Sequence, residues 1–225
     1  MITFRLNGLD VAVEKGSTIL EAAQFYGFPI PTLCHMEGLS PYGACRLCVV
    51  EIGDGPRARL VSSCTYPVEE GLVVRTASSR VLRARKMVME LLLASCPQSK
   101  IIQDLANAFD LHHQRFKQEH EDCIMCGRCV RMCAEQMAGK AIGFQGRGEK
   151  RSLGTPFNIR SEECRLCGGC IYVCPACQLR CTYTDPSKAI CGGCVNVSVP
   201  CVEKEAFDDM MCYMQPCVAC EIVKK

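Results

Sequence analysis

The stretches CIMCGRCVRMC at residues 123–133 and CRLCGGCIYVCP at residues 164–175 decide the fold of the second half of this chain. Each holds four cysteines in the order Cys-x2-Cys-x2-Cys-x3-Cys. Three cysteines at two-residue gaps curl the backbone around one cubane-type [4Fe–4S] cluster. Gly127, Gly168 and Gly169 are expected to supply positive φ and close approach at this point. We therefore interpret the doublet as a two-cluster site, with zinc or chance spacing as the alternative.

The doublet also predicts how the cysteines are shared. In two-cluster ferredoxins the fourth cysteine of each run ligates the cluster of the other run. One [4Fe–4S] cluster is then expected to bind to Cys123, Cys126, Cys129 and Cys174. The other is expected to bind to Cys164, Cys167, Cys170 and Cys133. This exchange would hold the two clusters close together, as rapid electron hopping requires.

Composition points to metal binding in a reducing compartment. Cysteine accounts for 21 of the 225 residues. Residues 1–16 lack the basic start and apolar run of a signal peptide, and no apolar stretch is long enough to span a membrane. We expect a cytoplasmic chain in which thiolates bind metal rather than form disulfides. The formal net charge of +2 is too balanced to predict nucleic acid as the principal partner.

Residues 1–77 predict a β-grasp domain. Thr3–Leu6 and Val11–Glu14 alternate as strands about an Asn7-Gly8 turn, which is a strong hairpin signal. Ser17 is expected to cap a helix that runs through Tyr26. Further strands are expected at 47–52, 58–62 and 72–74. The order strand, strand, helix, strand is typical of the β-grasp fold.

Four cysteines of this domain predict a [2Fe–2S] site. Cys45 and Cys48 are separated by two residues, so both thiolates can bind one iron. Cys34 and Cys64 come from separate segments and would bind the second iron. Plant-type ferredoxins use a related loop with a shorter first gap. A zinc site is the alternative, although a long loop suits a flat cluster better than a tetrahedral knuckle.

Residues 78–118 are expected to form a helical linker. Apolar residues recur near helical spacing at Val81, Leu82, Met87, Val88, Leu91 and Leu92. The remaining face is expected to carry Arg80, Arg83, Arg85 and Lys86. That face either is solvated or docks an acidic partner.

The chain ends in a second group of eight cysteines. These are Cys177, Cys181, Cys191, Cys194, Cys201, Cys212, Cys217 and Cys220. We expect at least one further iron–sulfur cluster here, with zinc or unligated thiols as alternatives. The overall prediction is an α+β chain with a β-grasp [2Fe–2S] domain at 1–77, a helical linker at 78–118, a two-cluster [4Fe–4S] ferredoxin-like domain at 119–178, and a Cys-rich metal-binding tail at 179–225.

The cysteine spacings and the segments 141–144 (AIGF) and 155–157 (TPF) together support a family resemblance. Roughly the first 180 residues resemble the iron–sulfur module at the front of the large subunit of respiratory complex I. They are also similar to the diaphorase small subunit of NAD-reducing nickel hydrogenases and to the front of iron-only hydrogenases. One departure concerns a further [4Fe–4S] cluster, which complex I binds through a histidine and three cysteines. Cys96 stands alone at that point, so the resemblance predicts that this cluster is absent and that Cys96 is a structural thiol.

The resemblance implies a subunit that relays single electrons through its clusters. Its partners would be a flavin-bearing NAD(P)H-type subunit and a catalytic redox subunit, with ferredoxin as a further candidate. A free-standing soluble carrier of the polyferredoxin type is the alternative. The sequence has no G-x-G-x-x-G after a strand and no P-loop, which argues against a self-contained nucleotide-dependent enzyme.

Overall fold

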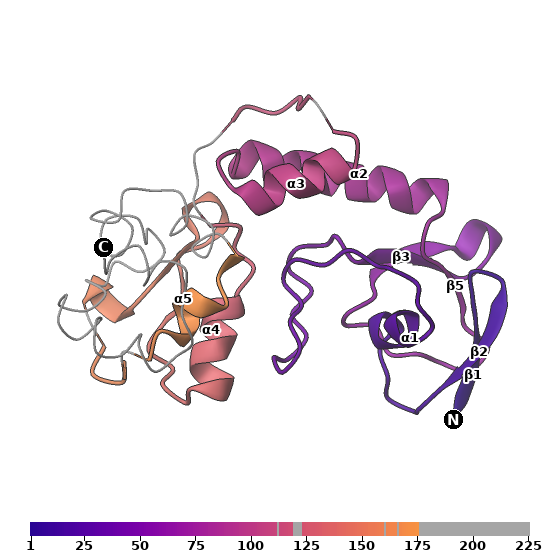
Figure 1. Ribbon diagram of the computed structural model, residues 1–225, viewed down its shortest axis with the longest axis horizontal. Coiled ribbons are helices and arrows are strands. Elements are labelled where there is room, and N and C mark those ends of the chain that lie inside the picture. The colour runs from indigo at the N-terminus through magenta and orange to yellow at the C-terminus, as the bar shows by residue number, and fades with distance from the viewer. Residues whose placement is uncertain (112, 119–122, 160, 166, 176–225) are drawn as a thin grey trace, which may run out of the picture. The chain divides into compact units, whose positions relative to one another are not determined.

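The computed structural model describes residues 1–111, 113–118, 123–159, 161–165 and 167–175. They fall into two compact units (Figure 1). The first unit contains Met1–Ala94 and Leu105–Lys117, and the second contains Ser95–Asp104 and residues from Gln118 onward. All eight cysteines of the C-terminal group lie outside the described residues.

The first unit is built on one mixed five-stranded sheet. Its elements and the helices that follow are β1 (Ile2–Leu6), β2 (Leu9–Val13), α1 (Ile19–Phe25), β3 (Val49–Ile52), η1 (Gly55–Arg57), β4 (Arg59–Ser62), β5 (Val73–Arg75), α2 (Ser79–Ser95) and α3 (Lys100–Ala108). The strand order is β2-β1-β5-β3-β4, in which only β1 and β5 pair in parallel. This is the β-grasp arrangement expected from the sequence, and the α+β class is confirmed.

Local chemistry explains the hairpin and the first helix. Asn7 and Gly8 both take positive φ, 51° and 90°, as a tight two-residue turn between β1 and β2 requires. Thr18, rather than the expected Ser17, caps α1: its side chain accepts the Glu21 N–H at 3.2 Å, and the Glu21 carboxylate accepts the Thr18 N–H at 2.7 Å. The reciprocal capping box requires the glutamate three residues after the cap, and this spacing selects Thr18.

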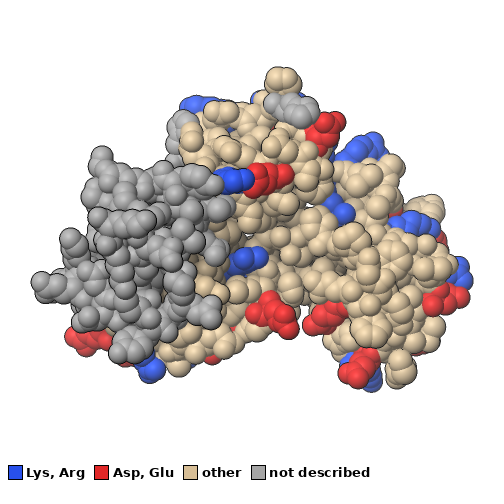
Figure 2. Space-filling model, viewed as in Figure 1, with Lys and Arg blue, Asp and Glu red and all other residues tan. Residues whose placement is uncertain are grey.

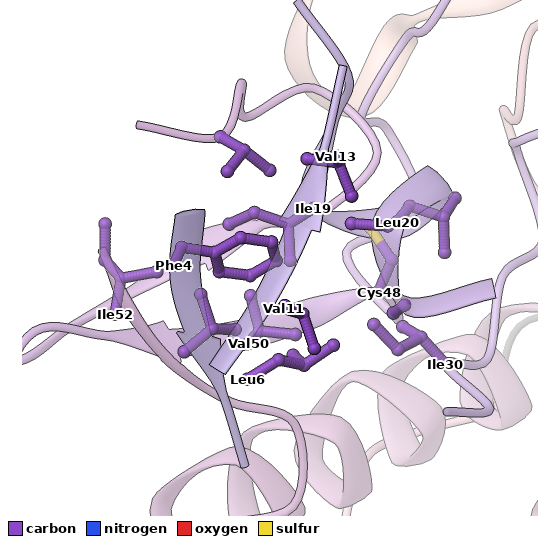
Figure 3. Close-up of a cluster of buried hydrophobic side chains, with 14 of the residues drawn as sticks. Phe4, Leu6, Val11, Val13, Ile19, Leu20, Ile30, Cys48, Val50 and Ile52 are labelled. Carbon is purple, nitrogen blue, oxygen red and sulfur yellow. The ribbon is translucent and has the colours of Figure 1, made fainter. Parts of the chain in front are cut away.

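A single apolar core lies between α1 and the sheet. Figure 3 shows side chains from β1, β2, α1 and β3 converging there, with Cys48 at the edge of the group. Phe4, Leu6 and Leu20 are almost completely buried. Successive residues of a strand face opposite sides of the sheet. Val50 therefore faces this core, whereas Glu51 faces away and lies 3.6 Å from the Arg80 guanidinium of α2.

Helix α2 buries a different face from the one expected. Val81 and Met89 are fully buried and Arg85 lies between them at four-residue spacing, only 4% exposed. Leu82 and Leu91, expected to be apolar contacts, are about half exposed. Residues four apart share one side of a helix, and α2 turns the side with Arg85 inward because this side contacts β3. The prediction that Arg85 belongs to an exposed basic face was wrong.

The second unit contains short elements around the cysteine runs. They are α4 (Arg128–Arg131), the π-helical turn η2 (Met132–Gln136), β6 (Gly143–Gln145), η3 (Gly148–Lys150), β7 (Ser152–Gly154), η4 (Pro156–Asn158) and α5 (Gly169–Tyr172). Strands β6 and β7 pair antiparallel. None of the helices in the described residues is long and apolar enough to cross a membrane.

The two cysteine runs fold alike. Gly127 and Gly168 each take a left-handed conformation with φ of 68° immediately before α4 and α5. Gly169 does not take positive φ, contrary to expectation. A Cβ atom there would instead lie 3.2 Å from Met137 Cγ and 3.3 Å from Met132 Cγ. Close packing of α5 against η2 therefore explains why a glycine occupies position 169.

Candidate iron–sulfur centres

The four cysteines of the first unit come from two segments of the β-grasp fold, the connection between α1 and β3 and the residues after β4. Cys34 and Cys45 lie on the long connection after α1, Cys48 immediately precedes β3, and Cys64 follows β4. The four cysteines are between 0% and 7% exposed. The fold thus brings together four thiols spread over residues 34–64 and buries all four.

These four thiols are in contact with one another. The Sγ atoms of Cys48 and Cys64 are 3.4 Å apart, and the backbone N–H of Cys45 donates to Cys34 Sγ at 3.4 Å. Hydrogen bonds from the side chains of Cys45 and, to a smaller extent, Cys64 lower the pKa of Cys34. The hydrogen bond between Cys45 and Cys34 raises the pKa of Cys45. The bond to Cys64 lowers the pKa of Cys48. The contacts form one continuous chain of sulfurs through all four residues.

An all-sulfur, water-excluded donor set fits a [2Fe–2S] cluster, which cysteine thiolates hold. No three His, Cys, Asp or Glu side chains in the described ranges converge as the ligands of one metal ion would. A binuclear cluster distributes its ligands over two irons and does not require that convergence. Loading with iron would release the protons that the thiols share here, because a thiolate is the form that binds metal.

The cysteines of the two runs lie closer to the surface of the second unit. Cys126 is buried, whereas Cys123, Cys129 and the other five described cysteines of the two runs are partly exposed. Backbone N–H groups point at their sulfurs: Met125 N donates to Cys123 Sγ at 3.4 Å, and Ala141 N donates to Cys133 Sγ at 3.3 Å. Such donors suit an anionic cluster, so this set also fits the expected cofactor.

Electrostatic coupling links the two runs. Burial is the main cause that raises the pKa of the Cys123 thiol to about 12, and the charges of Cys126, Cys174 and Cys96 contribute to that rise. Burial also raises the pKa of Cys129, and the strongest charge effect on it comes from Cys174. The last cysteine of the second run therefore interacts electrostatically with Cys123 and Cys129 of the first run.

Two polar residues near the [2Fe–2S] loop, Arg85 and Ser63, were not assigned to this site by the sequence interpretation. Arg85 donates from Nη2 to the carbonyl of Val49, directly after Cys48, at 2.8 Å. The fully buried Ser63 contributes to lowering the pKa of Cys48. By contrast Arg46, inside the loop, is exposed. The available signal for Arg85 was its position four residues from Val81 and Met89, which makes it a charged residue within an apolar stripe.

Fold and cysteine geometry together define an iron–sulfur protein with two consecutive cluster domains. Residues 1–79 match the 2Fe-2S iron-sulfur cluster binding domain family, and residues 122–178 match the 4Fe-4S dicluster domain family. One [2Fe–2S] cluster and a [4Fe–4S] pair are the cofactors of these domains. The resemblance found in the sequence is thereby confirmed at the level of both domains.

Curated relatives match about two thirds of this chain. The NADPH-Fe(3+) oxidoreductase subunit alpha of Geobacter sulfurreducens is 33% identical over 180 residues, which are 69% of this chain and 21% of that protein. The mitochondrial NADH-ubiquinone oxidoreductase 78 kDa subunit of Candida albicans is 33% identical over 177 residues, 67% of this chain and 24% of that one. This chain thus spans less than a quarter of the length of either relative.

A solved structure has a similar fold. A chain of an NAD+-reducing [NiFe]-hydrogenase matches with a TM-score of 0.59 and 31% identity, and the match covers 68% of this chain and 74% of that one. This chain belongs to the family of iron–sulfur proteins that carry a 2Fe-2S domain followed by a 4Fe-4S dicluster domain, and it is similar to these oxidoreductase and hydrogenase proteins.

Proposed function

We propose that this chain is the electron-transfer subunit of a multi-subunit oxidoreductase. It would carry single electrons between a flavin-bearing NAD(P)H-type subunit and another redox site. The observation that carries the proposal is the presence of a 2Fe-2S domain and a 4Fe-4S dicluster domain in one chain, which is similar to relatives named as subunits of NADPH- and NADH-linked oxidoreductases. Bound iron–sulfur clusters supply acceptance and release of one electron at a time.

Twelve cysteines are proposed as ligands, in three sets. The [2Fe–2S] set is Cys34, Cys45, Cys48 and Cys64, and the contacts among their sulfurs support it. The first [4Fe–4S] set is Cys123, Cys126, Cys129 and Cys174, supported by the charge of Cys174 on the first run. The second is Cys164, Cys167, Cys170 and Cys133.

The protein around these sets would control solvent and charge. Burial of the first quartet excludes water, and backbone N–H groups donate to the sulfurs of the second unit. Hydrogen bonds to sulfur and exclusion of solvent set the reduction potential of such centres. The proposed domains are the [2Fe–2S] domain at 1–77, the helical linker at 78–118, the two-cluster domain at 119–178 and the Cys-rich tail at 179–225. Helix α2 of the linker packs on the first domain.

Protein rather than nucleic acid is the proposed class of partner. In the described part of the face in Figure 2, acidic and basic side chains are interspersed. A flavoprotein subunit and a catalytic redox subunit are the proposed partners, with ferredoxin as a further one. A cytoplasmic location is part of the same proposal.

Purification of the tagged full-length chain from its native cells under anaerobic conditions tests this function. We expect a flavoprotein to co-purify and NAD(P)H to reduce the iron–sulfur centres in the complex but not in the isolated chain. A monomer that shuttles electrons at full rate between separately purified enzymes would establish the free carrier instead.

The C-terminal cysteines carry a separate proposal of at least one further cluster. Three clusters account for about ten iron atoms and ten acid-labile sulfides per chain. Iron and sulfide counts clearly above ten, with no zinc, would support the extra cluster. Counts near ten without zinc would exclude it, and stoichiometric zinc would assign the tail to the alternative metal.

A further inference from the structure

Helix α2 buries an arginine beside the [2Fe–2S] quartet. Arg85 is 4% exposed and lies on the helix face shared by Val81 and Met89, both fully buried. It is outside residues 1–79, the stretch that matches the 2Fe-2S domain family. The cluster domain therefore does not itself supply this cation, and the adjoining helix brings it in.

The contacts of Arg85 leave its charge uncompensated by protein carboxylates. Nη2 donates to the Val49 carbonyl at 2.8 Å, while Nε is buried without a hydrogen-bond partner in the described part of the chain. None of the ion pairs among the described residues includes Arg85, although Arg80 on the same helix lies 3.6 Å from Glu51. A guanidinium stays protonated in proteins, and an isolated buried charge is costly.

A charge that acts on Arg85 comes from the cysteine set. Val49, which accepts the Arg85 hydrogen bond, directly follows Cys48. Burial lowers the pKa of Arg85, and the charge of the Cys48 thiolate raises it, so the two groups interact. Cys48 is itself fully buried, which leaves little water to screen that interaction.

We propose that Arg85 is the positive counter-charge of the [2Fe–2S] cluster and raises its reduction potential. The inference rests on the proposed ligand set that includes Cys48. Reduction adds one electron and one negative charge to the centre, with no bond made or broken. A fixed cation stabilises that added charge, so the guanidinium favours the reduced form. Arg85 is thus a positioning and tuning residue, which makes α2 a determinant of the potential.

The test is a potentiometric titration of the full-length, cluster-loaded protein with dithionite, followed by the EPR signal of the reduced [2Fe–2S] centre. Arg85→Gln should make reduction less favourable by about tenfold, which is about 59 mV for a one-electron couple. Arg85→Lys keeps the charge and should retain most of the potential. Arg83→Gln is the matched control, because it removes an exposed arginine from the same helix and should leave the potential unchanged.

Failure of the Arg85 inference can be distinguished from failure of the proposed ligand set. An intact EPR signal with an unchanged potential in Arg85→Gln overturns the inference, and so does an equal shift in Arg83→Gln. Wild-type protein that assembles no [2Fe–2S] centre contradicts the proposed ligand set instead. If Arg85→Gln does not bind the cluster, wild-type protein labelled with guanidino-15N arginine provides the second measurement. A 15N coupling to the reduced [2Fe–2S] centre that is lost in Arg85→Lys supports the inference. The absence of this coupling in the wild-type protein overturns it.

Discussion

The two cysteine-rich regions of this molecule are held together in different ways. In the first, four cysteines at unequal gaps of ten, two and fifteen residues are buried at the edge of an apolar core that contains Phe4, Leu6 and Leu20. In the second, cysteines at two- and three-residue gaps are mostly half-buried, and α4 and α5 have four residues each. Isolated helices of that length are not stable in water.

The difference indicates separate sources of stability. The first region can bury apolar side chains without any metal, so its cluster is added to an existing fold. The second has few long elements to pack, so bonds between thiolates and iron would supply much of its folding free energy, as in small metal-dependent domains. The same chain thus combines a core-based domain with a metal-based one.

Removal of iron provides the largest test of this comparison. Anaerobic chelation of the full-length protein should unfold the second region while the β-grasp sheet keeps its hydrogen bonds. Amide hydrogen exchange should show lasting protection at β1 and β3 and rapid exchange at α4 and α5. Equal loss of protection in both regions would show that the first domain also depends on its cluster.

Single-ligand removal in the second region should have a smaller, local effect. Cys167→Ser should abolish one [4Fe–4S] signal and lower the iron content by about four atoms. The EPR signal of the [2Fe–2S] centre should persist, because its ligands lie in another unit. Cys48→Ser should produce the reverse pattern and serves as the control. Loss of the [2Fe–2S] signal in Cys167→Ser would contradict the modular division.

The two regions also differ in how much the sequence reveals. In the second, local spacing predicted the backbone at two positions, since Gly127 and Gly168 take the left-handed conformation expected directly after the second cysteine of each run. The β-grasp order followed from the Asn7-Gly8 hairpin and strand alternation. Arg85 could not be placed, because periodicity identifies a helix but does not say which side its neighbours cover. A charged residue on a helix is expected to be exposed, and only the contact between α2 and β3 shows that Arg85 is buried.

Truncation in the apolar core should destabilise the first region alone. Leu20→Ala should lower the free energy of unfolding by about 2–5 kcal/mol, because it leaves a cavity between α1 and the sheet. Urea unfolding of the metal-free protein, followed by far-UV circular dichroism, measures the loss. Leu9→Ala is the matched control, since Leu9 is 58% exposed on β2 and should change stability by less than about 0.5 kcal/mol. Equal losses would mean that the core does not stabilise the fold as argued.

The smallest expected effect concerns the segment after α3, where the first unit ends. The Glu90 carboxylate accepts the Arg115 backbone N–H at 2.7 Å, Nε at 2.9 Å and Nη2 at 2.9 Å. Hydrogen bonds from Arg115 hold the pKa of Glu90 below its usual range. The stabilisation is therefore fully present above the unfolded pKa of about 4.3 and is lost as pH falls through the lower folded value.

Glu90→Gln removes this pH dependence. The urea midpoint of the metal-free wild-type protein should exceed that of the variant at pH 7, and the difference should shrink as pH falls below about 4.3. Asp10→Asn, which removes an exposed carboxylate of the same unit, should show a smaller change with pH. A wild-type advantage that stays constant from neutral to acidic pH would mean that Glu90 acts through packing, and that its charge does not fasten the segment carrying Arg115 to α2.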